Sequence, residues 1–365
     1  MKSISTLKMK NWLKYFKNFS LNKFAHKKIP YSAQIEVTLQ CNAFCPFCSI
    51  PLLPSSFVYH EMNTNQIKYI IDQIAELGIN ILSFTGGEPT LRKDLPELIE
   101  YAAKSHNLEL GIATNGYLMP ELFKNNGGLK GLNYLLLSID YPQAKLHNKK
   151  RGINVFNRAL ETINIAHKRG IKVIINTVVM KDNIHLLEQI CELAETYNTP
   201  IELYPCENII REFQNIKYSI KGIQELIPDL SIWANIIRSL RKRFKNVLTD
   251  PISINIVESG GFGGHPTYNQ QYLRCHVSEA YLFVRWDGFI DYPCKIHPLI
   301  SFDALKIPLS MIYNSREARE IMQCHDNFEF CNGCYFGCAI VSSLPTKWKA
   351  LYSKYIQGYL KGNLI

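Results

Sequence analysis

The chain has 365 residues, of which 47% are hydrophobic and 20% are charged, a composition that excludes a disordered chain and leaves room for one large domain and a smaller one. The net charge is +10, but eight of the 41 basic residues fall within the first 35 positions, which hold no acidic residue. The remainder carries 33 basic against 31 acidic residues, and this near neutrality argues against a nucleic-acid-binding surface.

The N-terminal segment, residues 1–30, holds most of this positive charge. Trp12, Phe16 and Phe24 recur there at roughly helical spacing among lysines. The pattern predicts an amphipathic helix that either lies on an anionic membrane surface or packs on the body of the protein. We find no signal peptide and no run of about 18 apolar residues that would span a membrane. We therefore expect a cytoplasmic or peripherally membrane-associated protein whose eleven cysteines are metal ligands or free thiols.

After residue 30, apolar strands alternate with amphipathic helices. The predicted strands are Gln34–Thr38, Ile79–Phe84, Leu108–Ala113, Tyr134–Ile139, Ile171–Met180 and Ile201–Tyr204. The predicted helices are Thr64–Leu77, Leu95–Ser105, Asn154–Arg169 and Ile184–Tyr197. Near-continuous apolar strands separated by helices predict a parallel sheet covered by helices. Six repeats are fewer than the eight of a closed barrel, so residues 31–207 are expected to form an α/β fold, a partial (β/α)6 TIM-like barrel.

Polar and cysteine-containing segments follow the predicted strands one after another. In folds of this kind the functional groups lie at the C-terminal ends of the strands. The segments are, in order, Cys41–Cys48, Gly86–Pro89, Thr114–Gly116, and Ser138 with Asp140. This register predicts that they form one site.

The pattern changes after Glu207. Residues 208–270 are predicted to be a helical linker, with a helix over Leu230–Phe244 and a flexible glycine-rich junction at 260–264. Residues 271–340 are cysteine-rich and hold a predicted hairpin whose arms, Tyr281–Arg285 and Phe289–Tyr292, flank an Asp-Gly turn. Residues 341–365 are predicted to contain an amphipathic docking helix over Lys347–Leu360.

The first cysteine group predicts a metal centre. Cys41, Cys45 and Cys48 lie close together in the sequence, and no fourth cysteine is near. A [4Fe–4S] cube held by protein alone takes four cysteines, so three thiolates favour a cube with one iron open to a ligand that is not protein. Structural zinc is the alternative, but it takes four ligands that are usually arranged in pairs.

The spacing Cys41-x3-Cys45-x2-Cys48, with Phe47 before the last cysteine, resembles the cluster motif of the radical S-adenosylmethionine (SAM) superfamily. The resemblance extends from residue 31 to about residue 206. It implies a [4Fe–4S] cluster at which SAM is reductively cleaved to a 5′-deoxyadenosyl radical that abstracts a substrate hydrogen. It also implies a reducing partner such as flavodoxin or ferredoxin.

A second segment, Gly86-Gly87-Glu88-Pro89, resembles the SAM-binding motif of the same superfamily. The resemblance implies that Glu88 accepts a charge-assisted hydrogen bond from the SAM ammonium group. Gly86 and Gly87 would let the backbone approach closely, because they carry no Cβ.

Two further SAM contacts are implied near the fourth strand. Ser138 would bond the ribose hydroxyls, unless it only caps the strand. Arg151 lies in a segment that resembles the one in which an arginine meets the SAM carboxylate. Lys149 and Lys150 are competitors for that role.

The C-terminal cysteines resemble the auxiliary-cluster region of the SPASM and Twitch subfamilies. Four of them match, and the resemblance implies that they hold one auxiliary [4Fe–4S] cluster in a small cysteine-rich domain: Cys275, Cys294, Cys331 and Cys334. Zinc is the alternative, because paired cysteines also suit Zn²⁺. Cys324 and Cys338 are left over, and Cys191 and Cys206 are predicted to be packed thiols.

An auxiliary cluster near the substrate can accept an electron from a substrate radical. This favours a radical SAM enzyme that oxidises or epimerises a small molecule, and no residue is singled out as its catalytic group. The alternatives are a peptide-modifying maturase and a lipid-directed enzyme, the latter suggested by the basic aromatic segment around Trp12 and Phe24. A non-enzymatic iron–sulfur electron carrier fits less well, because it would not need Glu88.

Overall fold

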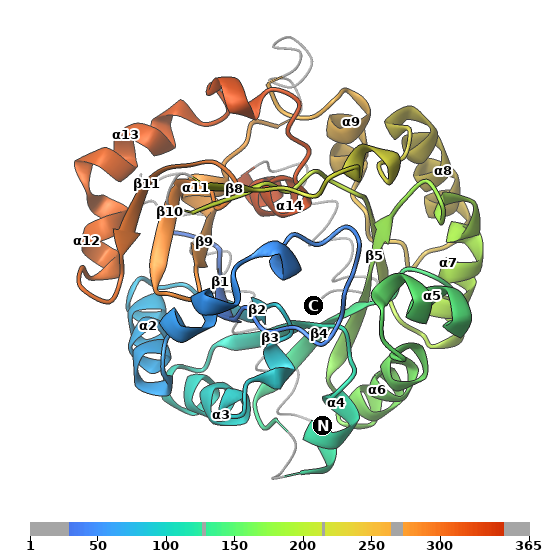
Figure 1. The fold of residues 1–365 in the computed structure, drawn as a ribbon, viewed down its shortest axis with the longest axis horizontal. Helices are drawn as coiled ribbons and strands as arrows, with labels where there is room; N and C mark the ends of the chain where they lie inside the picture. Colours follow the sequence, from blue (N-terminus) through green and yellow to red (C-terminus); the bar gives the residue numbers. More distant parts are fainter. Residues whose placement is uncertain (1–28, 126–128, 214–215, 264–272, 347–365) are drawn as a thin grey trace.

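The computed structural model describes residues 29–125, 129–213, 216–263 and 273–346. Its centre is a curved sheet of seven parallel strands with helices around the outside (Figure 1). The strands are β1 (Ser32–Thr38), β2 (Ile81–Gly86), β3 (Glu109–Thr114), β4 (Leu132–Ser138), β5 (Lys172–Val179), β6 (Ile201–Pro205) and β9 (Tyr281–Val284). Their order is β6-β5-β4-β3-β2-β1-β9, and every neighbouring pair is parallel. The expected partial α/β barrel is confirmed.

Helices follow the strands and cover the outer side of the sheet. They are α2 (Thr64–Glu76), α3 (Leu95–His106), α4 (Met119–Lys124), α5 (Ala144–Arg151), α6 (Phe156–Lys168) and α7 (Leu187–Thr196). Helix α2 begins with a capping box, in which the Asn63 side chain accepts from the Gln66 N–H and the Gln66 side chain accepts from the Asn63 N–H. It ends before Gly78, whose φ of 87° is the left-handed conformation that favours glycine at a helix end.

The two faces of the sheet differ in polarity. One level across β1 to β5 is a row of apolar side chains packed toward the helices and at most 1% exposed: Ile35, Phe84, Ile112, Leu135 and Val173. Because side chains alternate along a strand, the adjacent row points into the barrel. It consists of Gln34, Ser83, Gly111, Tyr134 and Lys172. This inner row is therefore more polar than the outer one.

The chain after β6 forms two short antiparallel ladders and a further set of helices. The ladders are β7 (Arg211–Phe213) with β8 (Ile216–Tyr218) and β10 (Phe289–Pro293) with β11 (Pro298–Asp303). The helices are α8 (Leu230–Arg243), α9 (Pro251–Glu258), α11 (Val277–Ala280), α12 (Leu309–Asn314), α13 (Arg316–Cys324) and α14 (Gly337–Ser343). In Figure 1, α8 and α9 continue the outer ring beyond α7, whereas α12 and α13 lie beside β10 and β11.

Short 3-10 helices fill several of the connections. They are η1 (Ile50–Leu52), η2 (Ser55–His60), η3 (Pro89–Leu91), η4 (Ile184–Leu186), η5 (Ile223–Glu225), η6 (Glu329–Cys331) and η7 (Leu344–Thr346). Two of them, η1 and η2, lie between β1 and α2, so the segment that follows the first cysteine group is largely turned rather than extended.

The seventh strand comes from the cysteine-rich segment. Strand β9 pairs with β1 in parallel, from Ser32 opposite Tyr281 to Ile35 opposite Val284. The predicted hairpin is wrong in its pairing. The turn is present, with the Arg285 N–H donating to the Phe289 carbonyl at 2.9 Å, but β10 takes β11 as its ladder partner.

The glycine-rich junction is packed rather than loose where the structure describes it. Phe262 is fully buried, its N–H donates to the Cys334 carbonyl at 2.7 Å, and its own carbonyl accepts from Gly333 at 2.9 Å. A Cβ on Gly261 would lie 2.5 Å from the Cys334 carbonyl oxygen. The segment therefore holds the turn between Cys331 and Cys334 in place.

Two predictions lie outside the described residues, namely the amphipathic helix of residues 1–30, of which only residues 29 and 30 are described, and the docking helix over Lys347–Leu360. Among the helices in the described ranges, none is both long and apolar enough to cross a membrane.

Candidate active site

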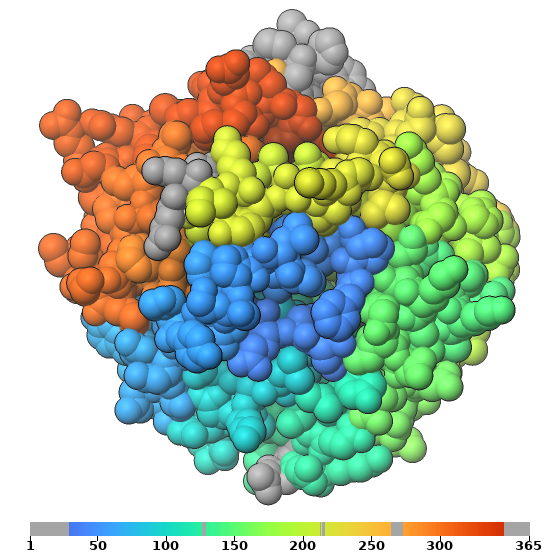
Figure 2. All heavy atoms as spheres, viewed as in Figure 1, coloured from blue at the N-terminus to red at the C-terminus, as the bar shows by residue number. Residues whose placement is uncertain are grey.

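The first cysteine group lies in the loop after β1. In Figure 2 the segment between β1 and α2, in blue, and the segment with β7 and β8, in yellow-green, lie across the centre of the barrel, and a hollow opens beside the blue segment. Cys41, Cys45 and Cys48 are free and partly exposed, and the Cys48 N–H closes a turn on the Cys45 carbonyl at 3.1 Å. Three thiols in one short loop fit a [4Fe–4S] cluster with one open coordination position.

Glycines join this loop to the end of β2. The Gly87 N–H donates to the Thr38 carbonyl at 2.8 Å, and the Glu88 N–H donates to the Gln40 carbonyl at 2.7 Å. A Cβ on Gly86 would lie 2.1 Å from the Thr38 oxygen, and one on Gly87 would lie 2.3 Å from the Gln40 oxygen. The glycines therefore permit a close backbone contact that anchors the start of the cysteine loop.

The thiols of Cys41 and Cys45 are protonated at neutral pH without a metal. Burial raises the pKa of Cys41 to about 11 and that of Cys45 to about 12, while the nearby Arg151 guanidinium acts in the opposite direction on both. Because thiolates are the metal-binding form, cluster assembly releases these protons.

Glu88 is almost completely buried, at 1% exposure, and has several protein donors. Its Oε1 accepts from the Thr90 N–H (3.2 Å), the Thr90 hydroxyl (2.6 Å) and the Thr114 hydroxyl (2.7 Å), and its Oε2 accepts from the Asn115 N–H (2.8 Å). Burial raises the pKa of Glu88, and these hydrogen bonds act in the opposite direction. A carboxylate oxygen has two acceptor positions, so Oε2 retains one for a further donor such as an ammonium group.

The end of β3 supplies contacts that the sequence did not assign individually. Thr114 and Asn115 bind Glu88 as described, and the Asn115 amide also donates to the Asn42 side-chain oxygen at 2.8 Å. Asn42 lies inside the cysteine loop. The predicted convergence of the strand ends is thus present at β1, β2 and β3. Hydrogen bonds that run from Asn42 through Asn115 to Glu88 connect these strand ends.

Arg151, at the end of α5, lies between β4 and the cysteine loop. Its Nε and Nη2 bind the Asp140 Oδ2 at 2.7 and 2.6 Å, and both residues are buried. Its guanidinium carbon lies 5.5 Å from the centre of the Phe47 ring, and its carbonyl accepts from the Phe44 N–H at 2.9 Å. Within the described residues its Nη1 has no recorded hydrogen bond, so the guanidinium keeps donors for an anion.

The competing lysines of the same segment lie elsewhere. Lys149 is exposed, and Lys150 forms an ion pair with Asp182. Arg151 is therefore the basic residue of this run that contacts the first cysteine loop, and its contact with the SAM carboxylate stays a prediction.

Ser138 lies at the end of β4, opposite Asn176 of β5 in the parallel register. It is partly buried, and in the described part of the chain its hydroxyl has no recorded hydrogen-bond partner. Its position at a strand end fits a ribose contact, and that role stays a prediction.

The structure brings the four matched C-terminal cysteines together. Cys275 precedes α11, Cys294 follows β10, and the turn at Cys331 and Cys334 closes with a hydrogen bond of 3.1 Å from the Cys334 N–H to the Cys331 carbonyl. Burial raises the pKa of Cys275, and the charges of the other three act in the same direction. Burial also raises the pKa of Cys331 and Cys334 to about 12. Four converging thiols suit one complete metal centre.

The remaining cysteines have other surroundings. The Cys324 thiol donates to the Glu320 carbonyl at 3.4 Å along α13. Cys338, in α14, is close to Lys295 and Glu207, and those two charges act on its pKa in opposite directions while burial raises it. Cys191 and Cys206 are fully buried, as expected for packed thiols.

A cavity of about 240 Å³ opens between the first cysteine loop and the C-terminal segment. Cys48 lies on one side of it, and Lys295, which follows Cys294, lies on another. The wall also holds charged side chains in pairs. Arg211 binds Glu36 through both Nη atoms, at 2.8 and 3.3 Å, and Arg285 contacts Asp291 at 3.2 Å. The cavity therefore adjoins the first cysteine group at Cys48 and reaches the residue that follows Cys294, and no sequence signal pointed to its polar wall.

Glu207, just after β6, is a further ionisable group that the sequence did not single out. Its Oε1 accepts from the N–H of Gly337, at the start of α14, at 2.8 Å. Burial raises its pKa from 4.5 to about 8, against the effects of this hydrogen bond and of Lys295. It is therefore largely protonated at neutral pH.

Comparison with known proteins identifies the family. The family model of the radical SAM superfamily matches residues 35–194, the span that contains Cys41, Cys45, Cys48 and Gly86–Pro89. Residues 35–194 therefore form a radical SAM domain, as the motifs implied. Its cofactors are accordingly a [4Fe–4S] cluster and SAM, and the cysteine-rich C-terminal segment fits an auxiliary cluster.

Individual relatives differ in how much of the chain they cover. An AdoMet-dependent heme synthase from Oleidesulfovibrio alaskensis is 34% identical over 44% of this chain and 41% of that protein. A PqqA peptide cyclase from Bradyrhizobium diazoefficiens is 25% identical over 69% of this chain and 68% of that protein. The chain thus spans less than half of the first of these relatives.

A solved structure shows how far the fold is shared. The crystal structure of Streptococcus suis SuiB bound to S-adenosylmethionine matches with a TM-score of 0.62, over 90% of this chain and 75% of that one, at 16% identity. At this identity the likeness shows a shared fold, and it extends past the barrel into the C-terminal segment.

Proposed function

We propose that the chain is a radical SAM enzyme that oxidises or epimerises a small molecule held in the cavity between the two cysteine groups. Cys41, Cys45 and Cys48 would hold the SAM-binding cluster, and Cys275, Cys294, Cys331 and Cys334 an auxiliary one. When bound, the first cluster and SAM supply a 5′-deoxyadenosyl radical that abstracts hydrogen from the substrate.

The observation that carries this proposal is one cavity that is lined by a cysteine of the first group and by the residue next to a cysteine of the second. Its wall includes Cys48 of the first group and Lys295, the neighbour of Cys294 in the second. A substrate in the cavity would lie beside both centres, so that one can start the reaction and the other can receive an electron. Simple hydrogen transfer would not need the second centre.

The protein groups around the first cysteine loop would bind and orient SAM. The free acceptor position on the Glu88 Oε2 suits the SAM ammonium group, and the Nη1 donors of Arg151 suit its carboxylate. Asp140 holds the Arg151 guanidinium in place, with a second carboxylate oxygen that accepts from the Val178 N–H at 3.0 Å. Ser138 would contact the ribose.

Modification of a peptide is the second candidate. The similarity to a PqqA peptide cyclase covers 68% of that protein and favours this reading. A cavity of about 240 Å³ would then take one side chain of the peptide rather than a whole small molecule. The lipid-directed alternative rests on residues outside the described ranges.

The proposal is tested by SAM cleavage. We expect the reconstituted and reduced protein to convert SAM into 5′-deoxyadenosine and methionine, measured by chromatography. Cys45→Ala should abolish the product, because two thiolates do not hold the cluster. Cys191→Ala, which removes a thiol buried in α7, should retain it. Iron binding without any 5′-deoxyadenosine in the parent would favour an electron carrier and overturn the proposal.

A further inference from the structure

Among the described residues, one positively charged side chain in the cavity wall has no ion-pair partner, whereas the other charged side chains there are paired. Five charged side chains line the cavity, and four of them are the pairs Arg211–Glu36 and Arg285–Asp291. The fifth is Lys295. Within the described part of the chain no ion pair or hydrogen bond of its ammonium group is recorded. Lys295 is therefore the cation among these lining side chains that has no ion-pair partner in the described ranges, whereas Arg285 is bound by Asp287, outside the lining, as well as by Asp291.

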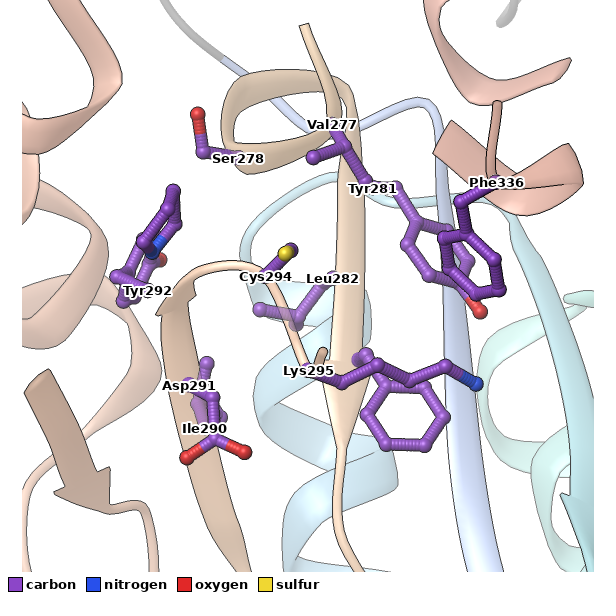
Figure 3. A pocket seen from close by; sticks show the side chains of 12 residues that line it. Val277, Ser278, Tyr281, Leu282, Ile290, Asp291, Tyr292, Cys294, Lys295 and Phe336 are labelled. Atoms are coloured by element: carbon purple, nitrogen blue, oxygen red, sulfur yellow. The ribbon is translucent and has the colours of Figure 1, made fainter. Parts of the chain in front are cut away.

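Aromatic rings surround the Lys295 ammonium group. Its Nζ lies 4.1 Å from the centre of the Phe283 ring and 5.6 Å from that of Phe336. Figure 3, which shows the neighbouring pocket that Lys295 also lines, draws this side chain extended, with the amino group pointing away from Cys294 and Asp291. Contacts with rings offset only part of the cost of keeping an ammonium group out of water. An anion beside Nζ would offset the rest of this cost.

Two acids in the surroundings of Lys295 are already engaged. Glu36 is bound by Arg211, and Glu207 accepts from the Gly337 N–H. A negatively charged ligand in the cavity is thus the group that can form an ion pair with the Lys295 ammonium group. Lys295 lines the cavity itself, so such a ligand would reach it directly.

We propose that the substrate carries a carboxylate and that Lys295 binds it, with the remainder of the substrate extending across the cavity toward Cys48. The proposal rests on the proposed function, because it assigns the substrate class of that same cavity. A single ammonium group without an ion pair matches one carboxylate. A phosphate, with nearly two negative charges, would need a second free cation. The guanidinium groups of Arg211 and Arg285 are already bound by carboxylates.

The test is equilibrium dialysis of the cluster-loaded protein with benzoate and with benzamide, its neutral isostere. Neither SAM nor reductant is present. We expect benzoate to bind at least about tenfold more tightly than benzamide, the effect of one charge-assisted hydrogen bond. Lys295→Met, which keeps the length of the side chain, should remove this preference, and Lys295→Arg should retain it. Lys306→Met, an exposed lysine of the same segment, is the matched control and should behave as the parent.

Three results would overturn the carboxylate site. They are equal binding of benzoate and benzamide by the parent, an unchanged preference in Lys295→Met, and competition by inorganic phosphate as strong as that by benzoate. The iron content of each variant shows whether it has folded, and Lys295→Gln replaces Lys295→Met if that variant loses iron. Benzoate preference without SAM cleavage would refute the proposed function alone, whereas SAM cleavage without benzoate preference would refute the carboxylate site alone.

Discussion

Glu88 illustrates how single residues of the site depend on their surroundings. Its carboxylate is held by Thr90, Thr114 and Asn115, which come from two different strand ends. The sequence motif predicted a SAM contact for Glu88. The structure adds that most of its acceptor capacity fixes the framework of the site, so the geometry of the remaining acceptor position is set before any ligand arrives.

Glu207 should make the stability of the folded protein depend on pH, and a single substitution can test this. Its pKa rises from 4.5 to about 8 on burial, so the folded protein binds a proton that the unfolded chain releases above about pH 4.5. The contribution of Glu207 to stability is present at low pH and is lost as the pH rises through about 8. Relative to Glu207→Gln, the parent should therefore lose thermal stability between pH 6 and pH 9.

The measurement compares melting temperatures of the two proteins at both pH values. Glu225→Gln, which removes an exposed carboxylate on η5, is the control, and its difference from the parent should be the same at both. A Glu207→Gln difference that does not change with pH would show that the Glu207 carboxylate is not protonated in the folded state.

At the scale of elements, the first cysteine loop and the end of β2 act as one unit. The Gly86 and Gly87 backbone lies so close to Thr38 and Gln40 that no side chain fits between them. Gly87→Ala should push the loop away and prevent the first cluster from binding. We expect its iron content to fall from about eight to about four per chain, because the C-terminal centre is remote from this contact.

A glycine outside the site controls for the substitution itself. A Cβ added to Gly170, which follows α6, would have no atom within 4 Å, so Gly170→Ala costs only the strain of its φ of 71°. It should keep the iron content of the parent. Full iron in Gly87→Ala would mean that the loop does not depend on this close contact.

Local sequence patterns predicted the first six strands and the helices α2, α3, α6 and α7, because each has a clear hydrophobic period, whereas the shorter α4 and α5 were not predicted. A strand at Tyr281–Val284 was predicted too, but its pairing with β1 was missed for a physical reason. Tyr281–Val284 is only four residues long, and its partner β1 lies about 250 residues earlier in the chain. The neighbouring Asp287–Gly288 turn favoured a hairpin, but long-range pairing with β1 prevailed. The packed segment at Gly261 and Phe262 was likewise read as flexible, because its partner at Cys334 is distant in sequence.

At the scale of the molecule, the fold brings the first cysteine group and the neighbour of Cys294, in the second group, to one cavity. The spacing of the cysteines could be recognised in the sequence, because metal ligands follow short local patterns. The cavity could not be predicted, because Glu36, Arg211 and Lys295 come from distant parts of the chain and form no pattern. The strand pairing of β9 with β1 places the C-terminal group beside the barrel and so creates this arrangement.

The iron content of the reconstituted protein tests most directly whether the chain holds two clusters. We predict about eight iron and eight sulfide per chain, falling to about four of each in Cys331→Ala/Cys334→Ala and in Cys41→Ala/Cys45→Ala/Cys48→Ala. Cys191→Ala should match the parent. About four iron in the parent, or zinc in the C-terminal site, would contradict the account.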